Sequence, residues 1–600
     1  MTLRYRVLLI LGLIASITIP AHTASGRRAN VDSAVQRALD ARDANAMRVI
    51  VRTTDARGRG DVVAQLRRGS AKLHREHPLI EAVTTTVTLP QLEELLRNPH
   101  VQGVSLDADV VSMGGSGKGS SNKNANAPPP NIGENHLLQT LGVGSFAHVL
   151  GGYDVGIAVI DSGVQPSEEL KVAAFYDFQD GTARATAPYD NYGHGTHVAG
   201  LIANNGSKTG GKYRGLAAYS RIIGMKVLDG LGVGRTSNVI AAIEFAIANR
   251  TALKLDIINL SLGHPVYEPA FQDPLVLAVE RAAAAGIVVV ASAGNNGQNR
   301  WTQQIGYGGI TSPGNAPSAL TVAAIDTKGT NLHSDDEIAY YSSRGPSWYD
   351  GFQKPDIALP GRSLVSTLAT DSTIAALYPD RIITEGGGSY VRMSGTSMAA
   401  AVGSGAAALV LEVNRYLLLG DKSYSGWSPS PLTPNMVKAI LQWTAYTLPG
   451  MDTLTQGAGS VNGLGAVSLA YNIDPRKRVG TEWLVTNLEP YTTTADGETL
   501  NWAQRIVWGD RLVWGVAMYY NDPAWQQGVL WGDRLVWGDR LVWGVSTVWD
   551  DASIWGNRIV WGDGMLTIES DDSGANRIVW GDLWGGWLFS SFVNSWAVIE

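Results

Sequence analysis

The chain has 600 residues, a formal net charge of −7 and no cysteine. This length exceeds what one hydrophobic core serves, so we expect several domains of about 100–200 residues each. The mild charge gives no electrostatic reason to expect nucleic acid or an anionic membrane surface as a partner. Without cysteine the chain can form no disulfide, no thiolate metal site and no cysteine nucleophile.

Residues 1–24 are organised like a secretory signal peptide. Arg4 and Arg6 precede an apolar run over 7–15, and small residues follow over 20–26. A positive start, an apolar middle and a small-residue end predict export, so we expect a secreted protein, with cell-surface association as a further option. The alternative is a membrane anchor, but the run is shorter than the ~18–20 residues that span a bilayer.

We expect residues 45–113 to form a small α+β domain. The order of extended and helical runs in the sequence predicts a strand, a helix, a strand, a helix and a strand, over residues 47–52, 61–73, 83–89, 91–97 and 101–106. Pro90 supports the second helix because proline fits a first helical turn. Residues 114–130 are rich in Gly, Ser, Asn and Pro, which predicts a flexible linker.

Residues 131–475 predict an α/β domain, because apolar strands alternate with helical runs. The segments lie at 156–160, 197–203, 222–227, 237–249, 257–260, 275–285 and 287–291. Continuous apolar strands separated by helices favour a parallel sheet with helices on both faces. Functional residues should then lie in loops at the carboxyl ends of the strands. Asp161 and Asn295 both follow such strands.

Residues 476–600 hold most of the nineteen tryptophans, and from Trp525 to Trp561 they recur every six residues. Because six is even, a β conformation places each tryptophan on the same face. Gly-Asp between the units supplies turns. We therefore expect a β-rich hexapeptide-repeat tail. Three roles stay open: a module that binds a surface, polymer or partner, a cap on the preceding domain, or a processed extension needed for export.

Three motifs of the central domain supply an acid, a base and a nucleophile in small-residue turns. They are Val-Ile-Asp-Ser-Gly at 159–163, His-Gly-Thr-His-Val-Ala-Gly at 194–200 and Gly-Thr-Ser-Met-Ala at 395–399. A serine hydroxyl is a weak nucleophile at neutral pH unless an imidazole takes its proton and a carboxylate orients that imidazole. The motifs predict acyl transfer with Ser397, His194 and Asp161 in these roles.

In this order the motifs resemble those of the subtilisin-like serine proteases, or subtilases. The resemblance implies a subtilisin-like fold and a secreted serine endopeptidase that works through an acyl-enzyme. It implies that 45–113 is a ferredoxin-like propeptide, which serves as intramolecular inhibitor and folding aid of an autoprocessed zymogen. The maturation cut would fall at the end of that domain or within the linker. Segment 293–297 resembles the one that carries the oxyanion-hole asparagine, which here is Asn295.

The resemblance also implies contacts with an extended polypeptide substrate, which pairs with strand edges. Two segments would flank the substrate, and three further residues would line the base of the primary pocket. These residues are Gly232, Val233, Gly234, Ser261, Leu262, Gly263, Ser292, Gly294 and Thr311. The three pocket residues carry no charge, which argues against a requirement for Lys or Arg at the cleaved position.

The resemblance implies that the chemistry needs no cofactor. Many subtilases bind structural calcium, and Asp335-Asp336-Glu337 is an oxygen-rich candidate, with a solvated acidic face as the alternative. Met398-Ala399-Ala400 stands where subtilases usually have a proline. We expect the helix there to persist, because alanine is the best helix former.

Two other functions stay open. The chain could be a subtilase that folds without cutting. It could also be a secreted adhesion or structural protein, in which the tail does the work and the protease fold is a scaffold.

Overall fold

The structure is a computed structural model of the chain that describes residues 29–113, 135–299, 302–419, 428–495 and 497–508, with short strands at 511–514, 559–560, 566–570 and 576–580. The predicted signal peptide, the linker at 114–130 and the tryptophan repeats from Trp525 to Trp555 lie outside the described residues. These three expectations stay predictions.

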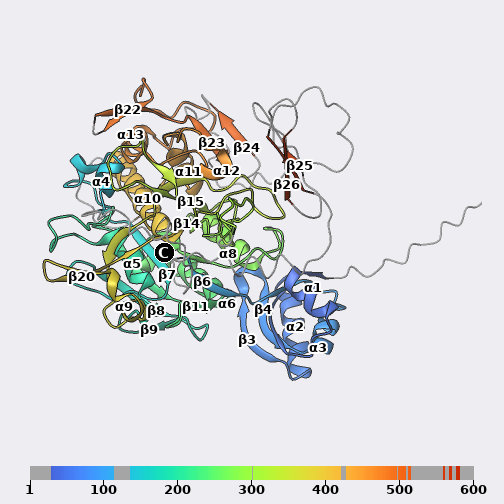
Figure 1. Cartoon of the computed structure of the whole chain (residues 1–600). Helices are drawn as coiled ribbons and strands as arrows, with labels where there is room; N and C mark the ends of the chain where they lie inside the picture. Colours follow the sequence, from blue (N-terminus) through green and yellow to red (C-terminus); the bar gives the residue numbers. More distant parts are fainter. Residues whose placement is uncertain are drawn as a thin grey trace, which may run out of the picture.

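The N-terminal domain is a five-stranded sheet of order β1-β5-β2-β4-β3 with helices on one side (Figure 1). Its elements are β1 (Asn30–Val31), α1 (Ser33–Asp40), β2 (Met47–Thr53), α2 (Ala56–Arg68), β3 (Lys72–His77), η1 (Pro78–Ile80), β4 (Ala82–Val87), α3 (Leu89–Leu95) and β5 (Val101–Leu106). The domain thus begins before residue 45, since β1 pairs with β5 and Asp32 caps α1.

The predicted helix 61–73 differs from the observed one. Asp55 caps α2 by accepting from the Gly58 N–H at 2.7 Å, so the helix begins earlier than predicted. It ends at Arg68, before Gly69 and Ser70, and Ser70 has a φ of 54°. The chain then turns into the edge strand β3, which the sequence pattern did not predict.

The central domain contains the predicted parallel sheet. It has nine strands in the order β16-β15-β14-β12-β7-β10-β8-β9, with β17 beside β15. The strands are β7 (Gly156–Asp161), β8 (Val172–Asp177), β9 (Arg184–Ala185), β10 (Arg221–Lys226), β12 (Leu255–Leu260), β14 (Val288–Ser292), β15 (Leu320–Asp326), β16 (Glu337–Ile338) and β17 (Ile357–Pro360). Only the pairs β15–β16 and β8–β9 are antiparallel.

Helices cover both faces of this sheet, as predicted. They are α5 (His194–Ala203), α6 (Thr236–Ala248), α8 (Pro274–Ala284), α10 (Thr396–Leu419), α11 (Pro434–Trp443) and α13 (Gly463–Asn472). Successive residues of β7 point to opposite faces. Ile157 and Val159 pack with α5, α10, α11 and α13, whereas Ala158 and Ile160 pack with α6 and α8.

Helix α10 runs through the centre of the domain without a break, as expected for alanines in place of the usual proline. Among the described residues, its stretch Thr396–Tyr416 is long and apolar enough to cross a membrane, but the 18 residues of its most apolar part are buried inside the protein. This is the pattern of a core helix.

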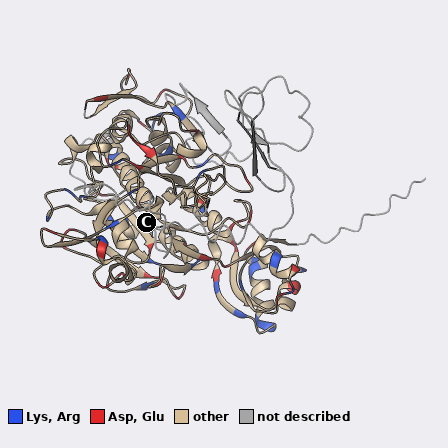
Figure 2. Cartoon of the chain, in the orientation of Figure 1, with Lys and Arg blue, Asp and Glu red and all other residues tan. Residues whose placement is uncertain are grey.

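The remaining elements are short and lie around the sheet. They are α4 (Leu137–Thr140), η2 (Gly144–Phe146), α7 (Arg250–Leu253), β18 (Leu364–Thr367), α9 (Thr373–Leu377), η3 (Pro379–Arg381), β19 (Ile382–Glu385), β20 (Gly388–Met393) and α12 (Thr453–Gln456). Figure 2 shows acidic and basic residues interspersed along the described ribbon, in keeping with the mild net charge.

The N-terminal domain packs on α6 and α8 of the central domain (Figure 1). Ile50, Ile80 and Ala82 join the apolar cluster beneath those helices. Polar contacts reinforce the interface, because Asp107 accepts from the N–H and the hydroxyl of Ser237 at 2.8 Å each. Arg48 forms an ion pair with the same carboxylate at 2.6 Å.

The apolar core continues beyond residue 475, where the sequence pattern placed the end of the central domain. Trp483, Trp502 and Ile506 are buried in the main cluster. The ring of Trp502 contacts that of Trp443 at a centroid distance of 5.5 Å, and its indole N–H donates to Thr493 Oγ1 at 2.7 Å.

Short antiparallel strand pairs make up what is described of the tail. They are β21 (Thr492–Ala495) with β22 (Glu498–Asn501), β23 (Arg505–Trp508) with β24 (Arg511–Trp514), and β26 (Leu566–Ser570) with β27 (Asn576–Trp580), which also pairs in parallel with β25 (Ile559–Val560). The predicted repeat architecture stays a prediction, because most of the repeats lie outside the described residues.

We expect Trp502→Ala to lower the free energy of unfolding by about 3–5 kcal/mol, because a buried indole would leave a cavity against Trp443. Val485→Ala, on the same segment but 57% exposed, is the matched control and should change stability little. Chemical denaturation of both variants measures the difference. Equal stability of the two would show that the segment does not share the core.

Candidate active site

The acid and the base meet at the end of a central strand. Asp161 is the last residue of β7, and His194 is the first residue of α5. His194 Nδ1 lies 2.8 Å from Asp161 Oδ1, and both side chains are fully buried. An Nδ1–H that donates to this carboxylate leaves Nε2 free to accept a proton. Nε2 has no hydrogen-bond partner among the described residues.

A glycine allows this close approach. A Cβ on Gly195 would lie 2.2 Å from the carbonyl oxygen of Gly163 and 3.0 Å from Asp161 Cβ. The small residues of the motifs therefore have a steric role, since they let the two turns touch.

Asp190, which the sequence analysis did not single out, holds these two turns together. Its carboxylate accepts from the turn after Asp161 and from the residues around His194. The donors are Ser162 Oγ (2.9 Å), Tyr192 N (3.2 Å), Gly193 N (2.8 Å), Thr196 N (2.9 Å) and Thr196 Oγ1 (2.7 Å). Burial raises the pKa of this carboxyl, and the hydrogen bonds oppose that shift. The sequence held one signal of this role, an acid just before the start of a helix, because such carboxylates bind nearby backbone N–H groups.

The second histidine of the motif has a structural place. His197 is buried, and its Nε2 lies 3.1 Å from the carbonyl oxygens of Leu364 and Val391. Burial, assisted by the charge of His194, lowers the pKa of His197 to about 3. This neutral imidazole therefore fastens α5 to β18 and β20.

The candidate nucleophile Ser397 is the second residue of α10, which packs against α5. Its hydroxyl donates to the carbonyl oxygen of Ser261 at 3.0 Å, so it is not hydrogen-bonded to His194. Ser261 Oγ in turn donates to the Ser397 carbonyl oxygen at 3.1 Å. The candidate nucleophile is thus tied to one of the predicted substrate-binding segments.

Asn295, the predicted oxyanion donor, is fixed beside the Ser397 turn. Its Oδ1 accepts from Thr396 N and Thr396 Oγ1, each at 3.0 Å. This orientation leaves the amide Nδ2 pointing away from α10, and it donates to the carbonyl oxygen of Met113 at 2.5 Å. The side-chain amide therefore binds a peptide carbonyl next to Ser397.

That carbonyl belongs to the end of the N-terminal domain. This end occupies the cleft between segments 232–234 and 261–263, which were predicted to flank the substrate. Strand β6 (Asp109–Ser112) lies between β11 (Val233–Arg235) and β13 (Leu262–Gly263), antiparallel to both. Ser112 N donates to the Gly232 carbonyl oxygen at 3.2 Å. Met113 N donates at 3.1 Å to the Ser261 carbonyl oxygen, which also accepts from Ser397. The six predicted flanking residues thus bind a segment of their own chain, and their role toward substrate stays a prediction.

The Met113 side chain lies against the predicted primary pocket. A Cβ on Gly263 would meet the Met113 methyl at 2.9 Å and Thr311 Oγ1 at 3.1 Å. A Cβ on Gly294 would meet the Thr311 side chain at 2.9 Å, so these residues adjoin. Ser292 ends β14, and its buried hydroxyl has no partner among the described residues.

The sequence analysis missed Tyr192, which lies over the cleft. Its hydroxyl is 3.4 Å from Ser112 Oγ, and its ring covers Gly232, where a Cβ would come within 2.5 Å. An aromatic residue two positions before His194 was the only signal.

The acidic stretch 335–337 does not fit a calcium site. Asp335 accepts from Thr330, Asp336 lies 3.0 Å from His333, and Glu337 pairs with Lys328 at 2.8 Å. The carboxylates therefore turn to different partners. Within the described ranges, no group of three or more His, Asp or Glu residues is arranged to hold a metal ion.

Sequence comparison relates the chain around this site to a known family. The Subtilase family profile matches residues 152–466. The chain is 37% identical to serine protease AprX of Bacillus subtilis (strain 168) over 318 residues, or 52% of this chain and 66% of AprX. It is 37% identical to subtilisin of Bacillus pumilus over 262 residues, or 43% of this chain and 78% of that protein. It spans only 56% of subtilisin E of Bacillus subtilis, at 36% identity.

A solved structure shares the fold. The crystal structure of fervidolysin from Fervidobacterium pennivorans, described as a keratinolytic enzyme related to subtilisin, matches with a TM-score of 0.55 and 23% identity. The match covers 74% of this chain and 63% of fervidolysin.

We expect Asp190→Ala to lower the free energy of unfolding by about 3 kcal/mol, because it leaves several buried donors without an acceptor. Asp190→Asn keeps one acceptor oxygen and should lower the free energy of unfolding by less. Asp380→Ala, at an exposed carboxylate, is the control. Urea unfolding of the three variants tests the ranking, and a loss for Asp190→Ala no greater than that of the control would contradict it.

Proposed function

The chain belongs to the subtilase family of serine peptidases, and from this we propose that it hydrolyses peptide bonds as a secreted endopeptidase made as a self-processing zymogen. The observation that carries the proposal is the Asn295 amide. It donates to a peptide carbonyl in the cleft while its own oxygen is held by the turn of Ser397. A carbonyl held in this way is positioned for attack.

In the proposed reaction, Ser397 Oγ adds to the carbonyl carbon of the substrate as His194 Nε2 takes its proton. Asp161 holds the imidazole in the required tautomer and stabilises its charged form. Asn295 Nδ2 and the Ser397 N–H bind the oxyanion, in a buried site where such donors act strongly. His194 then protonates the leaving amine, and water, activated by the same imidazole, releases the acyl group. The reaction needs no cofactor.

The hydroxyl of Ser397 must turn from Ser261 toward His194 before it reacts. This turn breaks one hydrogen bond among the described residues, the one to the Ser261 carbonyl oxygen. Catalytic hydrogen bonds are often long or misdirected before a substrate is in place.

We assign residues 29–113 as the inhibitory propeptide. The support is that β6 fills the gap between β11 and β13, which is where an extended substrate would pair. The Met113 carbonyl is the one bound by Asn295, which favours Met113–Gly114 as the maturation bond. The sequence pattern left this bond open between the end of the domain and the linker.

The same segment indicates which side chain the primary pocket takes. The Met113 methyl lies against Gly263, which also adjoins Thr311, and the predicted pocket residues carry no charge. A pocket of this composition favours a long apolar side chain at the cleaved position, because burying an unpaired charge is costly.

The first test compares the wild-type chain with Ser397→Ala. We expect a fluorophosphonate to label the mature wild-type protein but not the variant. N-terminal sequencing should give Gly114 as the first residue of the wild type, whereas Ser397→Ala should keep residues 29–113 attached. Absence of labelling in a folded wild-type protein would favour the non-catalytic adhesion function. Removal of the propeptide from Ser397→Ala at the same bond would assign processing to another protease.

The second test varies Met113. Met113→Asp should slow self-cleavage by about 10–100-fold, because the carboxylate would be buried without a partner, and Met113→Leu should be cut at a similar rate. Val111→Asp is the matched control, since Val111 lies in β6, two residues before Met113, and is 40% exposed. Gel time courses of propeptide release give the rates. Cleavage of Met113→Asp as fast as that of Met113→Leu would refute the pocket assignment.

A further inference from the structure

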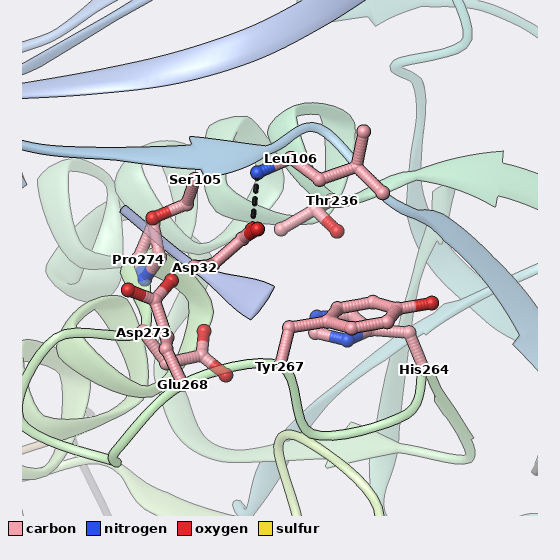
Figure 3. Close-up of a pocket in the computed structure, with 9 residues that line it drawn as sticks. All are labelled: Asp32, Ser105, Leu106, Thr236, His264, Tyr267, Glu268, Asp273 and Pro274. Atoms are coloured by element: carbon pink, nitrogen blue, oxygen red, sulfur yellow. Dashed lines mark hydrogen bonds between the residues drawn. The ribbon is translucent and has the colours of Figure 1, made fainter. Parts of the chain in front are cut away.

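A second contact between the N-terminal domain and the peptidase domain adjoins the ends of β11 and β13 and gathers acids. Figure 3 shows a small cavity there, lined by Asp32 and Ser105 from the N-terminal domain and by Glu268 and Asp273 from the peptidase domain. All three acids line this cavity, where the Asp32 carboxylate turns toward Leu106 N (Figure 3) and Asp273 caps α8 by accepting from Leu275 N at 2.8 Å. Each of these three residues is less than 7% exposed. Three acids therefore share one enclosed site across the interface.

The contacts of these acids tie the site to docking. Asp32 accepts from Val35 N at 2.6 Å and from Leu106 N at 2.5 Å, so it is fixed within the N-terminal domain. The next residue, Ser33, donates its N–H to the Tyr267 carbonyl oxygen at 3.0 Å, across the interface. Docking thus brings Asp32 against the segment that carries Glu268.

Opposing positive charge is scarce around this cavity. The acids are Asp32, Glu268, Asp273 and Asp350, with Asp109 nearby but paired with Arg235 at 2.9 Å. The basic groups are Arg52 of β2, which is buried and attracts Glu268 and Asp273, and Arg37 of α1. His264 and the hydroxyls of Tyr267 and Tyr349 complete the titratable groups that face the acids among the described residues.

We propose that this acidic interface is a pH-dependent latch on the propeptide, which docks with a proton held by the Asp32–Glu268 pair and undocks when that proton is lost. The proposal rests on the proposed function in one respect, since undocking would open the cleft of a peptidase. The occupied cleft keeps Ser397 covered in the docked state. The latch would therefore make activation depend on the pH outside the cell.

The direction of the pH effect follows from linkage. Burial, and then the charges of Asp273 and Asp32, raise the pKa of Glu268 well above its ordinary value. Burial also raises the pKa of Asp32. Undocking exposes both groups to water, so their pKa values fall back. Groups that bind protons more tightly in the docked state than in the undocked state stabilise docking. This stabilisation is complete at pH values below their undocked pKa and is lost as the pH rises through their docked pKa.

The test uses the full chain with Ser397→Ala, which cannot cut itself whatever the outcome. Hydrogen–deuterium exchange of segments 101–113 and 264–273, corrected for intrinsic exchange, measures how often the domain undocks. We expect undocking to increase at least about tenfold between pH 5 and pH 8, because the proton held in the docked state is lost as the pH rises. In Ser397→Ala/Glu268→Gln the increase should stay below about threefold, because the amide is neutral throughout.

Matched variants make the result decisive. Asp107→Asn removes the charge of a different interface carboxylate, the one paired with Arg48. This change should raise undocking at every pH without removing the pH dependence. If circular dichroism shows Glu268→Gln to be unfolded, Asp32→Asn replaces it with the same expectation. Two results would contradict the proposed latch. One is undocking that is equal at pH 5 and pH 8, and the other is a Glu268 variant that keeps the pH dependence of its parent. Because the background is inactive, neither result affects the fluorophosphonate test of the peptidase.

Discussion

The hydrogen bond between His194 Nδ1 and Asp161 Oδ1 requires the end of a central strand and the start of a helix to meet inside the protein. Most of the surrounding structure serves this meeting. Asp190 joins the two turns, and Lys226, buried with its ammonium group on Asn191 and on the carbonyl of Leu228, closes the same region from β10. Buried polar groups are stable only when their partners are in place. The folded core and the reactive geometry are therefore the same network.

The three-stranded sheet β11-β6-β13 links this network to the N-terminal domain. Its middle strand comes from one domain and its outer strands from the other. Backbone pairing of this kind depends little on side chains, so the same edges suit any extended polypeptide. Specificity then falls to the pocket beside Gly263 and to residues such as Tyr192 that cover the cleft. Under the proposed function, inhibition and substrate recognition would use one surface.

Much of the fold follows from local sequence. Apolar runs predicted the parallel strands, and the alanines after Ser397 predicted an unbroken helix, because both depend on neighbours in the chain. The edge strand β3 was missed, since its Lys-Leu-His-Arg-Glu-His sequence lacks apolar alternation and gains its place by pairing with β4. Asp190, Tyr192 and Met113 were also missed. Their importance comes from partners far away in sequence, such as Ser162, Gly232 and Asn295.

The packing of Trp483, Trp502 and Ile506 into the main core has a consequence for the rest of the tail. Any protease that trims this chain from its carboxyl end reaches, near residue 506, a segment whose backbone is held by the folded body. Trimming beyond that point would uncover Trp443, whereas trimming before it leaves the core intact. The chain that leads toward the repeats is thus anchored on the peptidase domain as far as Ile506.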